Sequence, residues 1–178
     1  MHIVIHILCQ KLMNFLFGIW PSINPVKLGP NRETVERTMI TKTDQKYFQK
    51  AYQTALLSDY HKTHVGCVAV YQGSIISIGC NTIKTHPLQK KYNRYRHIEY
   101  DKGYKTLPRL HAEINCLAAI RDMDINFSKV KLYIYRAGYG GVFKLARPCP
   151  SCMAAIRDME IKHVYYTTDD GYAYEKIE

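Results

Sequence analysis

Apolar side chains in the first half of the chain follow a helical spacing and then form two short continuous runs. After Asp44, which we interpret as a helix N-cap, they recur every three or four residues and predict a one-sided helix: Phe48, Ala51, Tyr52, Ala55 and Leu56. The two apolar runs lie at residues 65–71 and 74–80, and Gln72-Gly73 between them suits a two-residue hairpin turn. This part of the chain therefore predicts a helix followed by a β-hairpin.

Helices and strands alternate in the second half. Residues 112–120 are apolar almost all round, which predicts a buried helix that ends near Asp122. The later elements are a strand, a loop with room for a short strand, a helix, a strand and a short final element, at residues 131–135, 136–147, 149–159, 163–167 and 172–177. A helix separates the last two full strands, so they should run parallel and be joined by a right-handed crossover. The predicted fold class is α/β, a three-layer α-β-α sandwich with a mixed central sheet.

Residues 1–38 differ in pattern from the rest. Residues 3–20 are strongly apolar, but polar side chains interrupt them, so they are too short and too polar to predict a membrane span. The basic start and small-residue cleavage site of a signal peptide are not evident. A Pro- and Asn-rich connector follows, and Met39 stands just before the first helix. We predict a leader and linker outside the core at 1–38 and a single domain at 39–178; an element packed on the domain and a membrane-associated segment are the alternatives.

Length, composition and cysteine use indicate a globular protein with reduced thiols. A chain of 178 residues with 47% apolar residues is long enough to bury a core without covalent cross-links. Most of the six cysteines lie inside apolar runs or in a short motif described next. Such placement does not suggest a disulfide framework. We therefore expect an intracellular protein, located in the cytoplasm.

Two short motifs carry the strongest chemical signal: residues 111–113 (His-Ala-Glu) and residues 148–152 (Pro-Cys-Pro-Ser-Cys). Each opens a predicted helix, where free N–H groups and the helix dipole favour thiolates. A catalytic zinc site typically has three protein ligands and leaves the fourth position to water. The motifs supply three such ligands: His111, Cys149 and Cys152. Glu113 would then be the carboxylate that moves protons without binding the ion. The arrangement is typical of the zinc nucleobase deaminases.

Simpler interpretations explain less of this pattern. A Cys-x-x-Cys pair is often half of a structural zinc site, but the chain has no second such pair. A redox pair of the thioredoxin type would also begin a helix, yet it leaves His111 and Glu113 without a role. A zinc-stabilised binding module without turnover has no use for an unligated carboxylate at Glu113. The motifs therefore favour an enzyme over a binding module.

Residues 111–115 (His-Ala-Glu-Ile-Asn) and 146–153 (Ala-Arg-Pro-Cys-Pro-Ser-Cys-Met) resemble the cytidine/deoxycytidylate deaminase superfamily, and the resemblance covers roughly residues 44–168. It implies one zinc ion, a proton-moving role for Glu113, and three metal ligands: His111, Cys149 and Cys152. Residues 79–81 (Gly-Cys-Asn) resemble the strand-ending Gly-x-Asn of deoxycytidylate-type members, which implies that Asn81 contacts the sugar. The implied enzyme is a zinc-dependent hydrolase that deaminates a dCMP-like cytosine nucleotide, and superfamily members are commonly homo-oligomers. The shared zinc and glutamate do not by themselves choose cytosine over adenine.

Two features depart from the pattern of typical members. The loop at residues 136–148 is longer than the usual link between the strand and the Pro-Cys motif. The span at residues 84–109 has no obvious second metal set, so we expect no regulatory zinc and assign His86 and His97 to the surface.

Charge identifies a candidate substrate-binding segment. The net charge is +10, and residues 84–109 carry +6 of it, with eight basic residues against Glu99 and Asp101. The basic residues are Lys84, Lys90, Lys91, Arg94, Arg96, Lys102, Lys105 and Arg109. The segment leads directly into the metal motif, so it could hold a nucleotide phosphate. Its interleaved tyrosines could instead stack bases of a single strand, which makes a polynucleotide deaminase the alternative. A solvated basic lid is the simplest interpretation of the segment.

Overall fold

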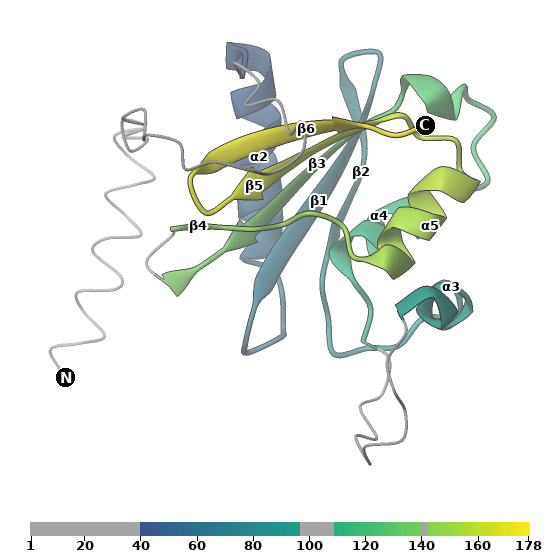
Figure 1. Ribbon diagram of the computed structural model, residues 1–178, viewed down its shortest axis with the longest axis horizontal. Coiled ribbons are helices and arrows are strands. Elements are labelled where there is room, and N and C mark those ends of the chain that lie inside the picture. Colours follow the sequence, from purple (N-terminus) through teal and green to yellow (C-terminus); the bar gives the residue numbers. More distant parts are fainter. Residues whose placement is uncertain (1–39, 97–108, 140–141) are drawn as a thin grey trace, which may run out of the picture. The chain divides into compact units, whose positions relative to one another are not determined.

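A six-stranded mixed sheet forms the centre of the domain that the structure describes (Figure 1). The computed structural model describes residues 40–96, 109–139 and 142–178. The strand order is β2-β1-β3-β5-β6, with β4 paired to β3. The strands are β1 (His64–Tyr71), β2 (Ser74–Cys80), β3 (Lys131–Ala137), β4 (Phe143–Lys144), β5 (His163–Thr168) and β6 (Gly171–Lys176). The predicted leader at 1–38 and residues 97–108 of the basic segment lie outside the described ranges.

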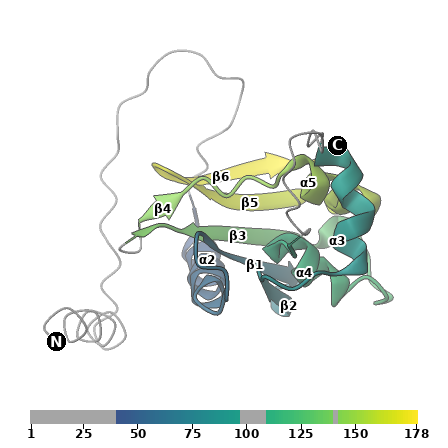
Figure 2. The same cartoon turned by 90° about the horizontal axis from the view of Figure 1, so that it is seen from below.

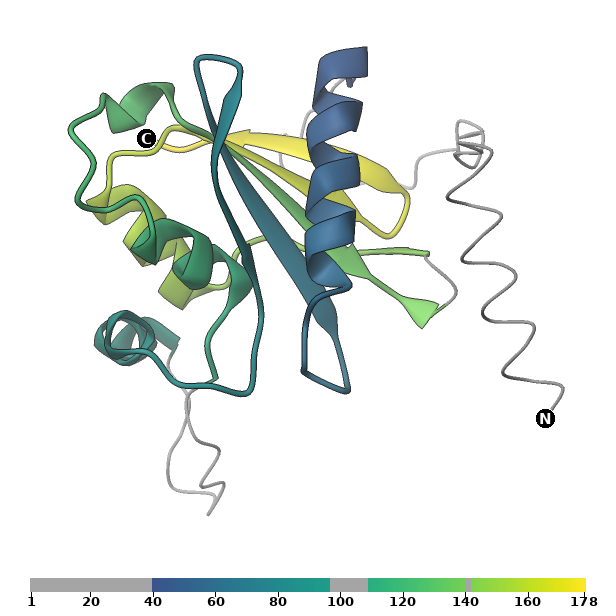
Figure 3. The same cartoon turned by 180° about the vertical axis from the view of Figure 1, so that it is seen from behind.

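Helices cover both faces of the sheet. The described helices are α2 (Lys42–Ala55), α3 (Pro87–Tyr92), α4 (Ala112–Ala118) and α5 (Pro150–Asp158), with 3-10 turns η1 (Asn93–Arg96) and η3 (Phe127–Lys129). Side chains alternate along β1, so Cys67 and Ala69 join the core under α4 and α5, while Val68 and Val70 pack with α2 on the other face. Figure 3 shows α2 crossing its face of the sheet. The predicted three-layer α-β-α sandwich is therefore confirmed.

Strand directions agree with the sequence pattern. β1 runs antiparallel to both β2 and β3. β3 and β5 are parallel, as predicted for strands separated by a helix, with Lys131 opposite His163. The C-terminal segment adds β6 antiparallel to β5, and β4 lies within the loop where a short strand had room. In the hairpin turn Gln72 and Gly73 have φ angles of 49° and 81°, the left-handed conformation that a tight hairpin turn requires.

Two helix boundaries differ from the prediction. The N-cap of α2 is Thr41, whose hydroxyl accepts the Asp44 N–H at 3.1 Å, while the Asp44 carboxylate accepts the Thr41 N–H at 3.1 Å. Asp44 is thus the third helical residue of a capping box, which the spacing Thr-x-x-Asp permits as well as a cap at Asp44 itself. α4 ends at Ala118, not near Asp122, because its last turn tightens into short-range bonds that carry the chain toward β3. Leu56 caps α2 and is 47% exposed, so it lies outside the buried stripe.

Candidate metal centre

His111 is placed by the end of β2 and the start of α4. Leu110 forms an antiparallel bridge with Thr82 just beyond β2, accepting the Thr82 N–H at 3.0 Å. His111 follows and is the N-cap residue of α4, as Cys149 is of α5. Cys152 lies in the first turn of α5, three residues after Cys149, so both sulfurs reach the same side. The two helix starts therefore meet on one face of the sheet.

The three side chains form a compact donor set. Nδ1 of His111 lies 3.5 Å from Sγ of Cys149 and 3.3 Å from Sγ of Cys152, and the two sulfurs are 3.7 Å apart. Tetrahedral zinc with usual bond lengths requires about 3.8 Å between two sulfurs and about 3.6 Å between nitrogen and sulfur. The observed edges agree with these values within a few tenths of an ångström. Among the described residues, this is the one group of His, Cys, Asp or Glu side chains close enough to hold an ion.

The charge state of the cysteines also suits a cation. Hydrogen bonding to Cys152 and to His111 lowers the pKa of Cys149 to about 3, despite its burial, so this sulfur is a thiolate at neutral pH. Burial raises the pKa of Cys152 well above the usual range. A divalent cation would stabilise the second thiolate directly. One nitrogen and two sulfur donors form a set that zinc prefers over hard cations such as magnesium.

Glu113 lies beside the donor set without belonging to it. It occupies the first turn of α4 and is 6% exposed. Burial raises the pKa of Glu113, and the nearby Cys149 charge acts in the same direction, while His111 opposes both. A carboxyl group with a raised pKa exchanges protons more readily near neutral pH than an exposed one does. The position and the electrostatics of Glu113 therefore suit a proton shuttle.

Asn81 has a clear structural role at the end of β2. Its Oδ1 accepts the Val65 N–H at 2.7 Å, and its Nδ2 donates to the carbonyl of Thr63 at 2.8 Å. These two bonds fasten the segment that enters β1. An asparagine amide has two N–H groups and two lone pairs, so the two bonds do not use its full capacity. Asn115 of α4 donates to the Cys80 carbonyl at 2.9 Å, which ties the residue next to Asn81 to the metal motif.

Sequence reasoning missed a helix and a buried polar network in the basic segment. α3 begins at Pro87, and His86 caps it by accepting the Leu88 N–H at 3.1 Å. His86 is partly exposed, and it belongs to no group of possible metal ligands among the described residues. The inner face of α3 carries Gln89, which is fully buried. His86-Pro87 is a helix-start signal of the usual kind, with a polar cap before a proline. His97 lies outside the described residues.

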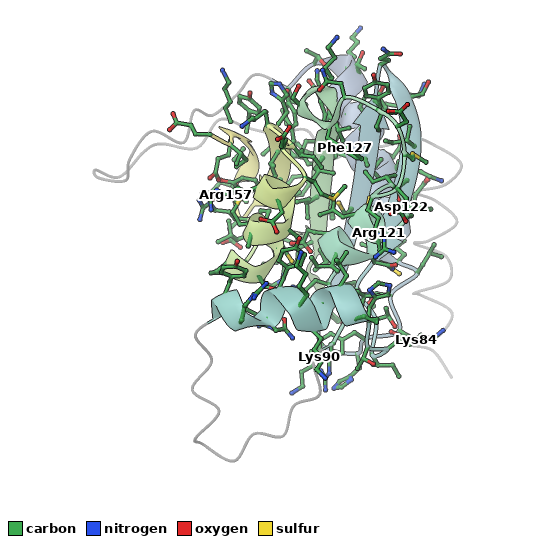
Figure 4. All side chains as sticks on the ribbon, turned by 90° about the vertical axis from the view of Figure 1, so that its right-hand side faces the viewer. Lys84, Lys90, Arg121, Asp122, Phe127 and Arg157 are labelled. Carbon is green, nitrogen blue, oxygen red and sulfur yellow. The ribbon has the colours of Figure 1, made fainter. Side chains whose placement is uncertain are left out.

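The described basic residues differ in their surroundings. Lys84 and Lys90 are exposed, and Figure 4 shows the Lys90 side chain projecting away from α3. Arg96 points inward, with Nη1 lying 3.4 Å from Nε2 of His111. The guanidinium of Arg109 lies 4.3 Å from the ring centre of Tyr60, a cation–π contact. Within residues 84–109, Arg96 is thus a described cation in contact with the donor set, and Arg109 lies two residues before His111 in sequence.

Comparison with known proteins identifies the family. The cytidine and deoxycytidylate deaminase zinc-binding region matches residues 41–168, which is most of the chain. The chain therefore belongs to the cytidine and deoxycytidylate deaminase family, and membership implies a hydrolase that removes amino groups. A comparison with curated protein sequences gives no match.

Two solved structures share the fold. The dCMP deaminase of the cyanophage S-TIM5, in complex with dCMP and dUMP, is 22% identical with a TM-score of 0.50, and the match covers 72% of this chain and 83% of that one. The cytidine deaminase of Burkholderia pseudomallei is 13% identical with a TM-score of 0.50, and the match covers 77% and 93% of the two chains. At these identities the likeness concerns the fold alone. In the part of the chain that the structure describes, no helix has the length and apolar character to span a membrane.

Proposed function

We propose that the protein is a zinc-dependent deaminase that converts a cytosine nucleotide of the dCMP type into the uracil nucleotide and ammonia. The observation that carries the proposal is the set of tetrahedral edge lengths among Nδ1 of His111 and the sulfurs of Cys149 and Cys152, beside the buried Glu113. These three side chains would hold one zinc ion. A Cys₂His set with a free carboxylate is what a hydrolytic zinc site in this family requires.

The proposed reaction adds water to C4 of the base. A bound zinc ion supplies the Lewis acidity that makes hydroxide available near neutral pH. Glu113 takes a proton from the attacking water and delivers it to ring nitrogen N3. It then transfers the second proton of the water to the amino group, which leaves as ammonia while the oxygen becomes the new carbonyl. Burial raises the pKa of Glu113, so its carboxyl group takes up and releases protons more readily near neutral pH.

The choice of a nucleotide is supported by the charges around the site. Arg96 lies against His111, and Arg109 is two residues before it, so either guanidinium could bind a phosphate. We assign the sugar contact to Asn81, through the hydrogen-bonding capacity that its two structural bonds leave over. The cyanophage dCMP deaminase with this fold was solved with dCMP and dUMP, which makes dCMP the first substrate to test.

A polynucleotide substrate is the second candidate. Tyr95 is 42% exposed and stacks on Tyr92, with 6.4 Å between the two ring centres. The guanidinium of Arg94 lies over the Tyr95 ring. An exposed ring next to a cation is a surface on which a base can stack. A single strand could follow these side chains toward the metal site.

A competition assay distinguishes the two substrates. Zinc-loaded protein is incubated with cytidine, dCMP, dCTP and a short mixed-sequence single strand together, and each product is weighed by mass spectrometry. Deamination raises the mass of the converted molecule by about one dalton, because an amino group is replaced by oxygen. Conversion of dCMP alone supports the lead substrate, whereas conversion of the oligonucleotide alone makes the second candidate correct.

The matched control is Glu113→Gln, which preserves the size of the side chain and removes its ability to carry protons. We expect the variant to bind zinc as the wild type does and to lose turnover by roughly 10²- to 10⁴-fold. Wild-type turnover in this variant would eliminate the proton-shuttle role.

A further inference from the structure

A single buried amide contacts both metal-ligand segments. Gln89 of α3 is fully buried, and an amide removed from water requires hydrogen-bond partners. Its Oε1 accepts the backbone N–H of His111 at 2.9 Å. Its Nε2 donates to Oδ1 of Asn93 at 2.8 Å and to Oγ of Ser151 at 3.2 Å. Both N–H groups of the amide are therefore used, and the oxygen is held toward His111.

The partners of Gln89 belong to the two segments that carry the metal donors. His111 supplies the nitrogen donor, and Ser151 lies between Cys149 and Cys152 in the first turn of α5. Ser151 is also fully buried, and its hydroxyl donates to Oδ1 of Asn93 at 3.4 Å. The three side chains thus form a closed hydrogen-bond network between α3 and the first turns of α4 and α5. Figure 2 shows α3 running beside these two helices.

The orientation of the Gln89 amide is determined by this network. A reversed amide would direct its N–H groups at the His111 N–H, so that two donors would face each other. It would also direct an oxygen at the Oδ1 of Asn93. The network therefore specifies one arrangement of the three side chains. In it, the backbone of His111 cannot move away from Ser151 unless at least one hydrogen bond of Gln89 breaks.

The same helix carries exposed cations on its outer side. Lys90 and Lys91 follow Gln89 directly and are exposed, while Gln89 and Asn93, four residues apart, face inward. The packing of α3 therefore places Gln89 in the network and leaves Lys90 and Lys91 on the outer side of the helix.

We propose that Gln89 is a positioning residue that holds His111 and the Cys149–Cys152 turn at the spacing that a metal ion requires, so that the seating of α3 sets the affinity of the site. This inference rests on the proposed zinc site. Partners in the second coordination shell typically change metal affinity by 10- to 100-fold when they are removed. Gln89 differs from most such partners in contacting the backbone of one ligand and the helical turn of the other two.

A purely structural role for Gln89 would be to attach α3 to the domain, and Tyr92→Phe supplies the matched control. Tyr92 is likewise a buried residue of α3, and its hydroxyl donates to Asp158 at 2.9 Å. Asp158 is the last residue of α5, at the opposite end from Cys149. Loss of this hydroxyl weakens the attachment of α3 to α5 without touching a residue next to a metal donor.

The experiment compares full-length wild type, Gln89→Met and Tyr92→Phe. Methionine is close to glutamine in size and cannot form the three hydrogen bonds. Zinc affinity is measured by competition with a chromophoric chelator, and the absorption spectrum of the cobalt-substituted protein reports the geometry of the donor set. We expect Gln89→Met to bind zinc roughly 10- to 100-fold more weakly than the wild type and to give an altered cobalt spectrum. Tyr92→Phe should stay within about twofold in affinity, with an unchanged spectrum, because its bond lies outside that shell.

The other outcomes distinguish failure of the proposed zinc site from failure of the role of Gln89. A wild-type protein that does not bind zinc would refute the proposed function itself. Zinc binding by the wild type with equal affinity in Gln89→Met, or equal losses in Gln89→Met and Tyr92→Phe, would overturn only the role of Gln89. If Gln89→Met does not fold, Ser151→Ala takes its place, since it removes one bond of the network. Weaker zinc binding by Ser151→Ala than by Tyr92→Phe supports the positioning role, and equal binding overturns it.

Discussion

Gly79 allows α4 to lie directly on β2, and Gly79→Ala should displace the helix that carries His111 and Glu113. A Cβ at position 79 would lie 2.6 Å from the carbonyl oxygen of Ala112 and closer still to the backbone nitrogen of Cys116. Both atoms belong to the backbone of α4, so a side-chain rotation cannot relieve the clash. The helix itself must move.

The size of the movement follows from the contact distances. Ordinary Cβ contacts begin at 3.4 Å, so the shortfall against the Ala112 oxygen is about 0.8 Å. Functional groups need to be held within about 0.5 Å of their productive geometry, and a misplacement of about 1 Å can reduce a rate by about 100-fold. We therefore expect Gly79→Ala to reduce kcat/KM by roughly 100-fold. Overpacking of this kind should also lower the free energy of unfolding by about 1–3 kcal/mol.

The control is Gly66→Ala on the opposite face of the sheet. A Cβ there would meet the backbone of Ala51 and Ala55 in α2, so this variant is overpacked in the same way but moves a helix without metal donors. Urea unfolding measures stability, chelator competition measures zinc affinity, and initial rates on the identified substrate give kcat/KM. We expect similar losses of stability in both variants and a loss of zinc affinity and activity in Gly79→Ala alone. Wild-type zinc affinity and activity in Gly79→Ala would refute the conclusion that the seating of α4 determines the site.

Three further predictions concern metal removal, pH and the N-terminal segment. Removal of zinc with a chelator should lower the Tm. Addition of free zinc at 100 times its Kd should raise the free energy of unfolding again by about 2.7 kcal/mol, which calorimetry can measure. A Tm that does not change on zinc removal would argue against a bound ion. Burial acts to raise the pKa of Asp44, but hydrogen bonds to Thr41 and Tyr133 outweigh it and lower the pKa below 3.8. The stabilising contribution of Asp44 should therefore be present above pH 3.8 and should disappear as the pH falls through the lowered pKa. Asp44→Asn should therefore cost about 1 kcal/mol at pH 7 in urea unfolding, a modest figure because the group is partly exposed, and the cost should decrease as the pH falls below 3.8. A cost that does not change with pH would contradict the assignment. A chain that begins at Met39 should fold and retain wild-type kcat/KM if residues 1–38 are a leader, and loss of either would favour a packed element.

Local sequence predicted most of the elements and the three candidate metal donors. A strand, a turn or a helix start depends on residues a few positions apart, so the Gln72-Gly73 hairpin and the parallel order of β3 and β5 could be predicted from spacing. Cys149 and Cys152 share one helical turn, and their chemistry points to a metal wherever the turn lies.

Tertiary structure alone decided how those donors are supported. Gln89 bonds across 22 residues to His111 and across 62 residues to Ser151, and no local pattern specifies partners so far apart in sequence. The amide of Asn81 binds the backbone before β1, a contact that depends on how β1 and β2 pair. Buried polar groups must find partners wherever the packed chain brings them, whereas helical and strand patterns report only the side chain's nearest neighbours. The residue types of the candidate donors can therefore be predicted from local sequence, whereas the distances between them depend on the packing of the core.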